Sequence, residues 1–261
     1  MKELIHFAHG NGFPALCYKQ MLDGLNPYYD YCYIDKIGHD PAFPVGENWH
    51  NLILEVIASI ERQADRPVIA LGHSLGGVLS LLAAIERPDL VKAVVMLDSP
   101  LLGLLKSSAV RLAKVFGIID RVTPAFRTKG RRKHWQSYEQ ILPYLKSKEL
   151  FKNFSDECLS DYIKYGLKYK TDGYYLRFNR LVEYQIYRTI PHIIPRYEGK
   201  LLTPSALIYG DKSNVVGKME LRYMKKNFNI TCYKTHGSHL FPMEYPQVVA
   251  AQVLRVLDKL T

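Results

Sequence analysis

The chain has 261 residues, 48% of them hydrophobic and 23% charged, with a formal net charge of +10 at pH 7. Such a chain can bury a substantial core as one domain or as one domain with a large insertion. Its longest apolar runs, such as residues 93–97 and 101–105, fall far short of the roughly 20 residues needed to span a bilayer, and its N-terminus lacks the long apolar stretch of a secretory signal.

The four cysteines are widely separated, at Cys17, Cys32, Cys158 and Cys232. They form no Cys-x-x-Cys pair and no dense framework, so we expect reduced thiols in a cytoplasmic protein. The close histidine pairs, His6 with His9 and His236 with His239, lack the carboxylate or thiol partners of a zinc site. We therefore expect neither a metal nor a cofactor.

Short apolar segments alternate with helical patterns at both ends of the chain. The predicted strands cover residues 4–8, 30–35, 68–72, 93–97, 205–209 and 230–234, and the predicted helices cover 18–25, 49–63, 75–86, 215–227 and 246–260. This alternation is typical of parallel βαβ winding. It predicts an α/β fold with a mostly parallel sheet of about six strands flanked by helices.

The segment 101–199 differs from its flanks in charge. It holds 19 basic and 9 acidic residues, so the whole positive excess of the chain lies there, together with ten of the nineteen tyrosines. Residues 101–119 have a helical pattern, which we expect to pack on the domain below, with contact to a membrane surface as the alternative. The basic run 129–135 is interpreted as a solvated loop, and no nucleic-acid partner is expected because no binding motif accompanies it.

The stretch from Gly72 to Gly77 has the sequence GHSLGG and follows an apolar run. Gly-x-Ser-x-Gly between a strand and a helix is typical of a nucleophile elbow, a tight turn that exposes a serine to substrate. A serine needs a neighbouring base, so Ser74 is the candidate nucleophile. Gly72 and Gly76 would let the backbones approach, and the N–H of Leu75 at the helix start would stabilise an oxyanion.

Other polar residues follow the remaining predicted strands. His9-Gly10-Asn11 follows the first, Asp98 the fourth, Asp211 the fifth and His239 the sixth. In an open α/β sheet, ligands gather at the carboxyl ends of the strands. These side chains are therefore expected near Ser74.

Together, the serine elbow, a following acid, a late histidine and the His-Gly loop resemble the α/β-hydrolase superfamily over nearly the whole chain. The resemblance implies that His239 is the general base and that the Asn11 backbone N–H joins Leu75 in the oxyanion hole, where the Asn11 side chain is a further candidate donor. It also implies a fold that lacks the usual first hairpin, with strand 30–35 at one edge. Residues 1–100 and 200–261 would be the core, and 101–199 a helical, basic cap over Ser74.

The acid of the expected triad has two candidates. Many members of the superfamily carry Gly-x-x-Asp after a late strand, but this chain has Gly210-Asp211-Lys212-Ser213. In a branch with serine at that slot, the acid follows the preceding strand, which corresponds here to Asp98. We favour Asp98, with Asp211 as the alternative.

The resulting hypothesis is a cofactor-independent serine hydrolase that cleaves a small carboxylic ester or thioester through an acyl-enzyme. The aromatic, basic cap suggests an apolar acyl or aromatic group and an anionic or lipid-like remainder. One alternative is a lipase or lysophospholipase that contacts anionic membranes peripherally. The other is a non-catalytic protein that holds a ligand in the same fold.

Overall fold

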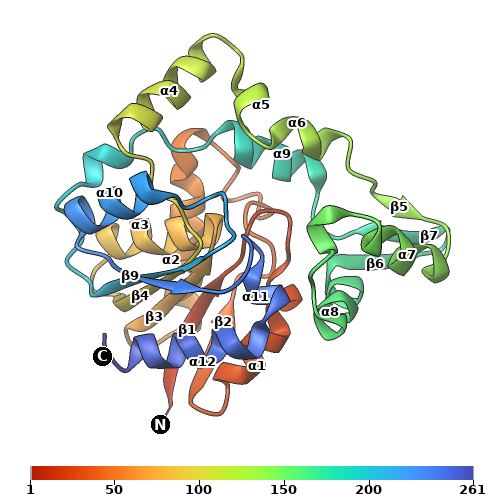
Figure 1. The fold of residues 1–261 in the computed structure, drawn as a ribbon, viewed down its shortest axis with the longest axis horizontal. Helices are drawn as coiled ribbons and strands as arrows, with labels where there is room; N and C mark the ends of the chain where they lie inside the picture. Colours follow the sequence, from red (N-terminus) through yellow and green to blue (C-terminus); the bar gives the residue numbers. More distant parts are fainter. Residues whose placement is uncertain (1, 261) are drawn as a thin grey trace.

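The computed structural model describes residues 2–260, and its main sheet has six parallel strands (Figure 1). The strands are β1 (Glu3–Ala8), β2 (Tyr29–Tyr33), β3 (Val68–His73), β4 (Val91–Leu97), β8 (Ser205–Gly210) and β9 (Thr231–Thr235). Their order is β2-β1-β3-β4-β8-β9, and every neighbouring pair is parallel. The predicted α/β class, the strand number and the edge position of the second strand are therefore confirmed.

Helices cover both faces of this sheet (Figure 1). One face carries α1 (Lys19–Leu25) and α12 (Pro246–Leu257), and the other carries α2 (His50–Gln63), α3 (Leu75–Glu86) and α10 (Lys218–Phe228). Along β1, Ile5 and Phe7 pack toward α1 and α12, whereas Ala8 packs toward the other layer. Both faces are apolar because side chains alternate along a strand and each side must be covered.

The chain between β4 and β8 forms smaller elements. Its helices are α4 (Leu104–Val115), α5 (Ile119–Val122), α6 (Ala125–Lys129), α7 (Ile141–Lys146), α8 (Asp156–Gly166) and α9 (Arg180–Arg188). Its strands are β5 (His134–Trp135), β6 (Leu167–Lys170) and β7 (Gly173–Leu176), which form a second, antiparallel sheet. The short helix α11 (Phe241–Glu244) precedes α12 in the main body.

The small sheet departs from the predicted all-helical segment. Strands β6 and β7 are joined by the two-residue turn Thr171-Asp172, and Lys170 pairs with Gly173. Tyrosines favour strands, and a Cβ on Gly173, at the start of β7, would overlap the Trp135 carbonyl. No strand was expected in residues 101–199, which were interpreted as a helical cap.

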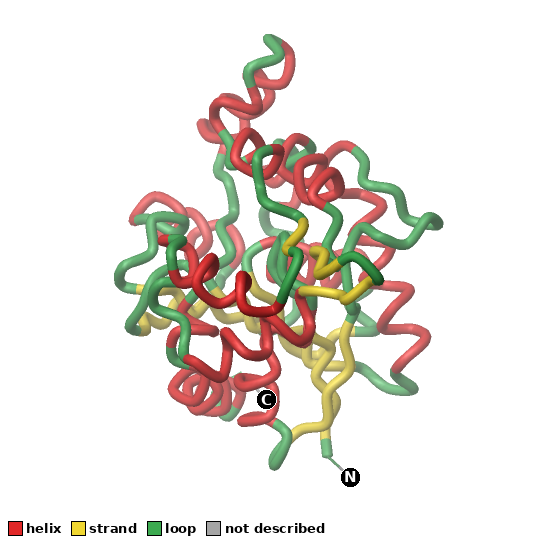
Figure 2. Tube along the Cα trace, turned by 90° about the vertical axis from the view of Figure 1, so that its right-hand side faces the viewer, coloured by secondary structure: helices red, strands yellow, loops and turns green. Residues whose placement is uncertain are grey.

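The two halves of this middle segment sit differently on the body (Figures 1 and 2). Helices α4 and α5 rise away from the main sheet at the top of both views. The part from β5 to α8 instead joins the main core, because Trp135, Leu145, Phe151 and Tyr162 belong to the same buried cluster as α1 and α12. Among residues 2–260, no helix has the length and apolar character needed to cross a membrane.

Candidate active site

Ser74 lies in the sharp turn between β3 and α3. Its backbone has φ 52° and ψ −115°, a conformation that a non-glycine residue rarely adopts. A Cβ on Gly76 would overlap the Ala8 carbonyl, and one on Gly72 would overlap the Gly76 backbone. The two glycines therefore permit the close packing that the elbow needs, as predicted.

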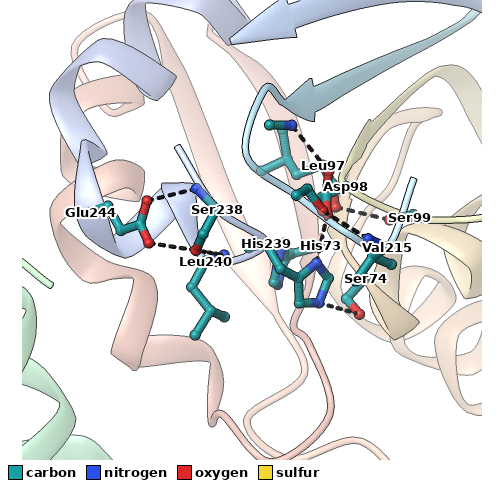
Figure 3. Close-up of polar contacts among 12 residues, drawn as sticks. His73, Ser74, Leu97, Asp98, Ser99, Val215, Ser238, His239, Leu240 and Glu244 are labelled. Carbon is teal, nitrogen blue, oxygen red and sulfur yellow. Dashed lines mark hydrogen bonds and ion pairs between the residues drawn. The ribbon is translucent and has the colours of Figure 1, made fainter. Parts of the chain in front are cut away.

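A row of hydrogen bonds connects Ser74 to His239 and Asp98 (Figure 3). The Ser74 hydroxyl lies 3.1 Å from His239 Nε2, and His239 Nδ1 lies 2.7 Å from Asp98 Oδ2. Because the carboxylate accepts from Nδ1–H, Nε2 of the neutral ring is free to accept the serine proton. The carboxylate of Asp98 is fully buried, whereas 28% of the His239 side chain is exposed.

The two candidate acids contact different histidines. Asp98 contacts His239 and also accepts hydrogen bonds from the Gly210 N–H and the Ser213 hydroxyl. Asp211 accepts from the Gly237 N–H, and its other oxygen lies 3.2 Å from His236 Nδ1. These two contacts lower the pKa of Asp211, with the Gly237 N–H as the larger cause. Asp98, and not Asp211, is therefore in position to orient His239.

The loop that carries His239 is fixed by Glu244. The Ser238 N–H donates to Glu244 Oε2 at 2.9 Å, and the Ser238 hydroxyl donates to Oε1 at 2.5 Å. That hydroxyl oxygen in turn accepts from the Leu240 N–H at 3.1 Å. The residues on both sides of His239 are thus held by one carboxylate, and the imidazole is presented to Ser74 with little freedom (Figure 3).

The predicted oxyanion donors are available. Among the described residues, the backbone N–H groups of Asn11 and Leu75 donate to no other protein group. The Asn11 side chain is anchored as well, because its Nδ2 donates to the Glu183 carbonyl at 3.0 Å. This bond ties the loop after β1 to α9 and uses one of the two N–H groups of the amide, so the side chain stays a candidate further donor.

Two buried histidines, which the sequence did not single out as supports, hold the loop before Asn11. His9 Nδ1–H donates to the Gly10 carbonyl at 2.8 Å, and His9 Nε2 accepts from the Ile37 N–H at 2.8 Å. Burial lowers the pKa of His9 to about 4, so the ring is neutral at pH 7. The Gly10 N–H donates to the Tyr18 hydroxyl oxygen at 3.1 Å.

The second histidine, His73, joins this loop to the His239 loop. Its Nε2–H donates to the His239 carbonyl at 2.9 Å, and its Nδ1 accepts from the Tyr18 hydroxyl at 2.7 Å. Burial, with a smaller contribution from His239, holds the pKa of His73 well below its usual value. The neutral His73 ring is thus hydrogen-bonded directly to the His239 backbone. Through Tyr18 it is also linked to the Gly10 backbone, next to Asn11.

A pocket of about 760 Å³ opens over Ser74 and His239. Its apolar wall includes Phe13, Leu145, Phe151, Leu176 and Leu240. Its basic residues are Arg127, Arg131, Arg132, Lys148 and Lys212. Its acidic residues are Glu149, Glu183 and Glu244, so the lining combines an apolar wall with charges of both signs.

One basic residue of the wall is part of a buried network. Arg131 lies 2.7 Å from Glu183 and donates to the Tyr162 hydroxyl at 2.5 Å. The sequence interpretation of residues 129–135 as a solvated loop is thus wrong for Arg131, whose side chain is largely buried against Glu183, and for Trp135, which is buried in strand β5. Within residues 2–260, no group of three or more His, Cys, Asp or Glu side chains is arranged to hold a metal ion.

Comparison with known proteins shows the family of this chain. The model of the alpha/beta hydrolase family matches residues 7–252. An uncharacterized hydrolase, YugF of Bacillus subtilis, is 26% identical over 255 residues, which cover 94% of this chain and 86% of YugF.

Solved structures share the fold at low sequence identity. E-2-(acetamidomethylene)succinate hydrolase superposes with a TM-score of 0.79 at 18% identity, over 99% of this chain and 92% of that one. The thioesterase domain from the curacin biosynthetic pathway superposes with a TM-score of 0.73 at 17% identity, over 97% of this chain and 91% of that one. At these identities the likeness concerns the fold alone.

Proposed function

The chain belongs to the alpha/beta hydrolase family, and we propose that it is a cofactor-independent serine hydrolase of carboxylic esters or thioesters. In this proposal, residues 1–100 and 200–261 form the catalytic core and residues 101–199 form the cap. The observation that carries the proposal is the row of contacts from Asp98 through His239 to Ser74, at the floor of a pocket. The cytoplasmic location expected from the sequence stays a prediction.

The proposed reaction proceeds in two halves. Ser74 Oγ attacks the carbonyl carbon while His239 Nε2 takes its proton, and Asp98 stabilises the resulting imidazolium. The carbonyl oxygen becomes an oxyanion that accepts hydrogen bonds from the N–H groups of Asn11 and Leu75. Collapse of the tetrahedral intermediate breaks the bond to the alcohol or thiol, which leaves with the proton from His239.

Water then completes the cycle. His239 removes a proton from a water molecule, the hydroxide attacks the acyl-enzyme, and Ser74 leaves as the hydroxyl after His239 returns the proton. The acid product carries the oxygen from water. Apart from the substrate and water, neither half needs a group that the chain does not supply.

The pocket supports a narrower substrate class. The aromatic and aliphatic wall favours an apolar acyl chain or ring, and the side chains of Arg127, Lys148 and Lys212 form no ion pair with another described residue. An anionic or lipid-like ester is therefore the preferred substrate. A thioester is the alternative, because the same attack on its carbonyl carbon releases a thiol.

Labelling of Ser74 by a fluorophosphonate tests the chemistry. We expect rapid labelling of the wild type and no labelling of Ser74→Ala. We also expect the wild type to hydrolyse members of a panel of esters and thioesters that are graded by chain length and charge. A well-folded wild type that is neither labelled nor active would overturn the proposal. Tight capture of a panel member without turnover would favour the non-catalytic binding protein instead.

A further inference from the structure

The arm formed by residues 104–129, which contains α4, α5 and α6, exposes an unusual amount of apolar surface. It projects above the main sheet at α4 and α5 (Figures 1 and 2). Eight of the nineteen large hydrophobic side chains that are exposed among residues 2–260 lie in it. They are Leu104, Leu105, Leu112, Val115, Phe116, Ile118, Val122 and Phe126.

The solvent side of α4 is the apolar one. Leu105, Leu112 and Phe116 are spaced by seven and four residues, so they share one face of the helix, and they are 75%, 56% and 72% exposed. The buried residues of the same helix are Ser107 and Ala113. The helix thus contacts the domain below, as expected, through these small residues and through Lys106 and Lys114, which pair with Glu220 and Glu47, while its large apolar side chains stay exposed. A monomeric protein seldom leaves so large an apolar area without a binding partner.

Positive charge accompanies this apolar surface. Residues 104–129 contain six basic residues and one acidic residue. Arg111, Arg121 and Arg127 are exposed and form no ion pair or side-chain hydrogen bond with another described residue. The acidic residue, Asp120, already interacts with Lys129 and Arg188 and accepts a hydrogen bond from Tyr184. The arm thus offers unpaired guanidinium groups beside exposed leucine and phenylalanine side chains.

We propose that this arm docks the protein on the surface of an anionic lipid bilayer. The apolar side chains of α4 and of the turn at Phe116 would enter the boundary between headgroups and acyl chains, and the arginines would lie among the negative headgroups. A second copy of the chain fits less well, because it would bring a surface of the same positive sign. The arm projects from the body (Figure 2), so a planar bilayer surface can reach it.

The arm also borders the entrance of the active-site pocket. Pro124, Arg127 and Thr128 line that pocket, so a docked arm would place the pocket mouth beside the membrane surface. This docking goes beyond the proposed ester hydrolysis, because it depends on residues outside the Ser74 site. A lipid-like ester could then enter without crossing bulk water.

Sedimentation of the full chain with lipid vesicles tests the proposal. We expect binding to phosphatidylcholine vesicles that contain about one third phosphatidylserine, little binding to phosphatidylcholine alone, and release by high salt. The double variant Phe116→Ser with Ile118→Ser should weaken binding at least about tenfold, because two apolar side chains no longer enter the bilayer. Its matched control, Leu202→Ser with Val248→Ser, removes exposed apolar groups away from the arm and should bind like the wild type.

A second pair of variants tests the charge. Arg111→Gln with Arg121→Gln should weaken binding to anionic vesicles about tenfold or more. Lys234→Gln with Lys259→Gln removes the same charge near α12, a helix that lies at the opposite end of Figure 1 from α4, and should have a much smaller effect. All variants should hydrolyse a short water-soluble ester at the wild-type rate, so failure of docking and failure of the hydrolase chemistry are separable.

Three results would overturn the docking proposal. The first is an absence of vesicle binding by the folded wild type. The second is equal binding by the arm variants and their controls. The third is a protein that does not bind vesicles but dimerises with rising concentration in sedimentation velocity, with the dimer lost in Phe116→Ser with Ile118→Ser. That result would assign the arm to contact between copies of this chain.

Discussion

Ser213 donates its hydroxyl to Asp98 Oδ2, the same carboxylate oxygen that accepts from His239 Nδ1. Ser213 occupies the slot where many relatives in the superfamily carry the acid, so the serine supports a carboxylate supplied by β4. The Val215 N–H donates to the Ser213 oxygen at 3.1 Å and orients the hydroxyl. The serine that stands in place of the usual aspartate therefore serves as a hydrogen-bond donor to the acid on β4.

The first prediction separates the two acids. Asp98→Asn should lower kcat by about 10³–10⁴-fold, because the amide favours the wrong tautomer of His239 and cannot stabilise its positive form. Asp211→Asn should lower kcat less than about tenfold, since Asp211 contacts His236. Steady-state kinetics on one ester give both values. Similar losses for the two variants would contradict the assignment.

The second prediction concerns the support of Asp98. Ser213→Ala removes one donor to the buried carboxylate, which corresponds to about 1.5–3 kcal/mol for a hydrogen bond to a charged group. We expect kcat to fall by about ten- to a hundredfold with little change in KM, and Ser213→Thr to restore most of it. A pH profile of kcat should shift as well, because the charge on Asp98 is less well stabilised. An unchanged profile would assign Ser213 a purely structural role.

The third prediction addresses the connection through His73. His73→Phe removes both the donor to the His239 carbonyl and the acceptor for Tyr18, so the His239 loop should lose its fixed position. We expect kcat to fall about tenfold, the size of one lost hydrogen bond, while KM changes little. His73→Gln keeps one donor and one acceptor and should retain most of the activity. If Phe and Gln behave alike in kcat and in the rate of fluorophosphonate labelling, the hydrogen bonds of His73 do not position the site.

The sheet could be predicted well because its signals are local. Each buried strand is an apolar run bounded by turn residues, and the predicted strands overlap the observed ones, with most ends within two residues. The elbow at Ser74 was also visible locally, because its glycines and its position between strand and helix form one short stretch. The carboxyl-end rule then brought Asp98 and His239 to the same edge of the sheet.

The supports of the site could not be predicted in this way. Ser213 meets Asp98 across 115 positions, and His73 meets the His239 carbonyl across 166. Such contacts depend on how loops pack in three dimensions, and serine or histidine at a strand end carries no signal for its partner. For α4 the sequence left two alternatives, packing on the domain or contact with a membrane, since periodicity identifies an apolar face but not what covers it.

The fourth prediction tests the buried pair in the pocket wall. Arg131→Met leaves the Glu183 carboxylate buried without its counter-charge and should destabilise the fold by about 3–5 kcal/mol. Replacing both residues by methionine should cost less, because no unpaired charge remains. Urea unfolding of the two variants measures the difference. The exposed pair of Lys146 with Asp156 is the control, and Lys146→Met should change stability little.

The fifth prediction is a pH dependence of stability that arises from Glu55. Its carboxylate is buried on α2 and accepts from the Gly38 N–H at 2.8 Å. Burial raises the pKa of Glu55 from 4.5 to about 7. Between these two values the folded chain binds more protons than the unfolded chain, so this group makes the free energy of unfolding fall as the pH rises.

Glu55→Gln keeps an acceptor for Gly38 and removes the charge. The variant should match the wild type near pH 4.5 and be more stable above pH 7, by up to about 2–3 kcal/mol. His6 and His9, whose pKa values burial lowers to about 4, act in the opposite direction, but they are present in both proteins and cancel in the difference. Urea unfolding of the pair at pH 5 and pH 8 measures that difference. If the difference in free energy of unfolding between Glu55→Gln and the wild type is the same at pH 5 and pH 8, Glu55 has the same pKa in the folded and the unfolded chain.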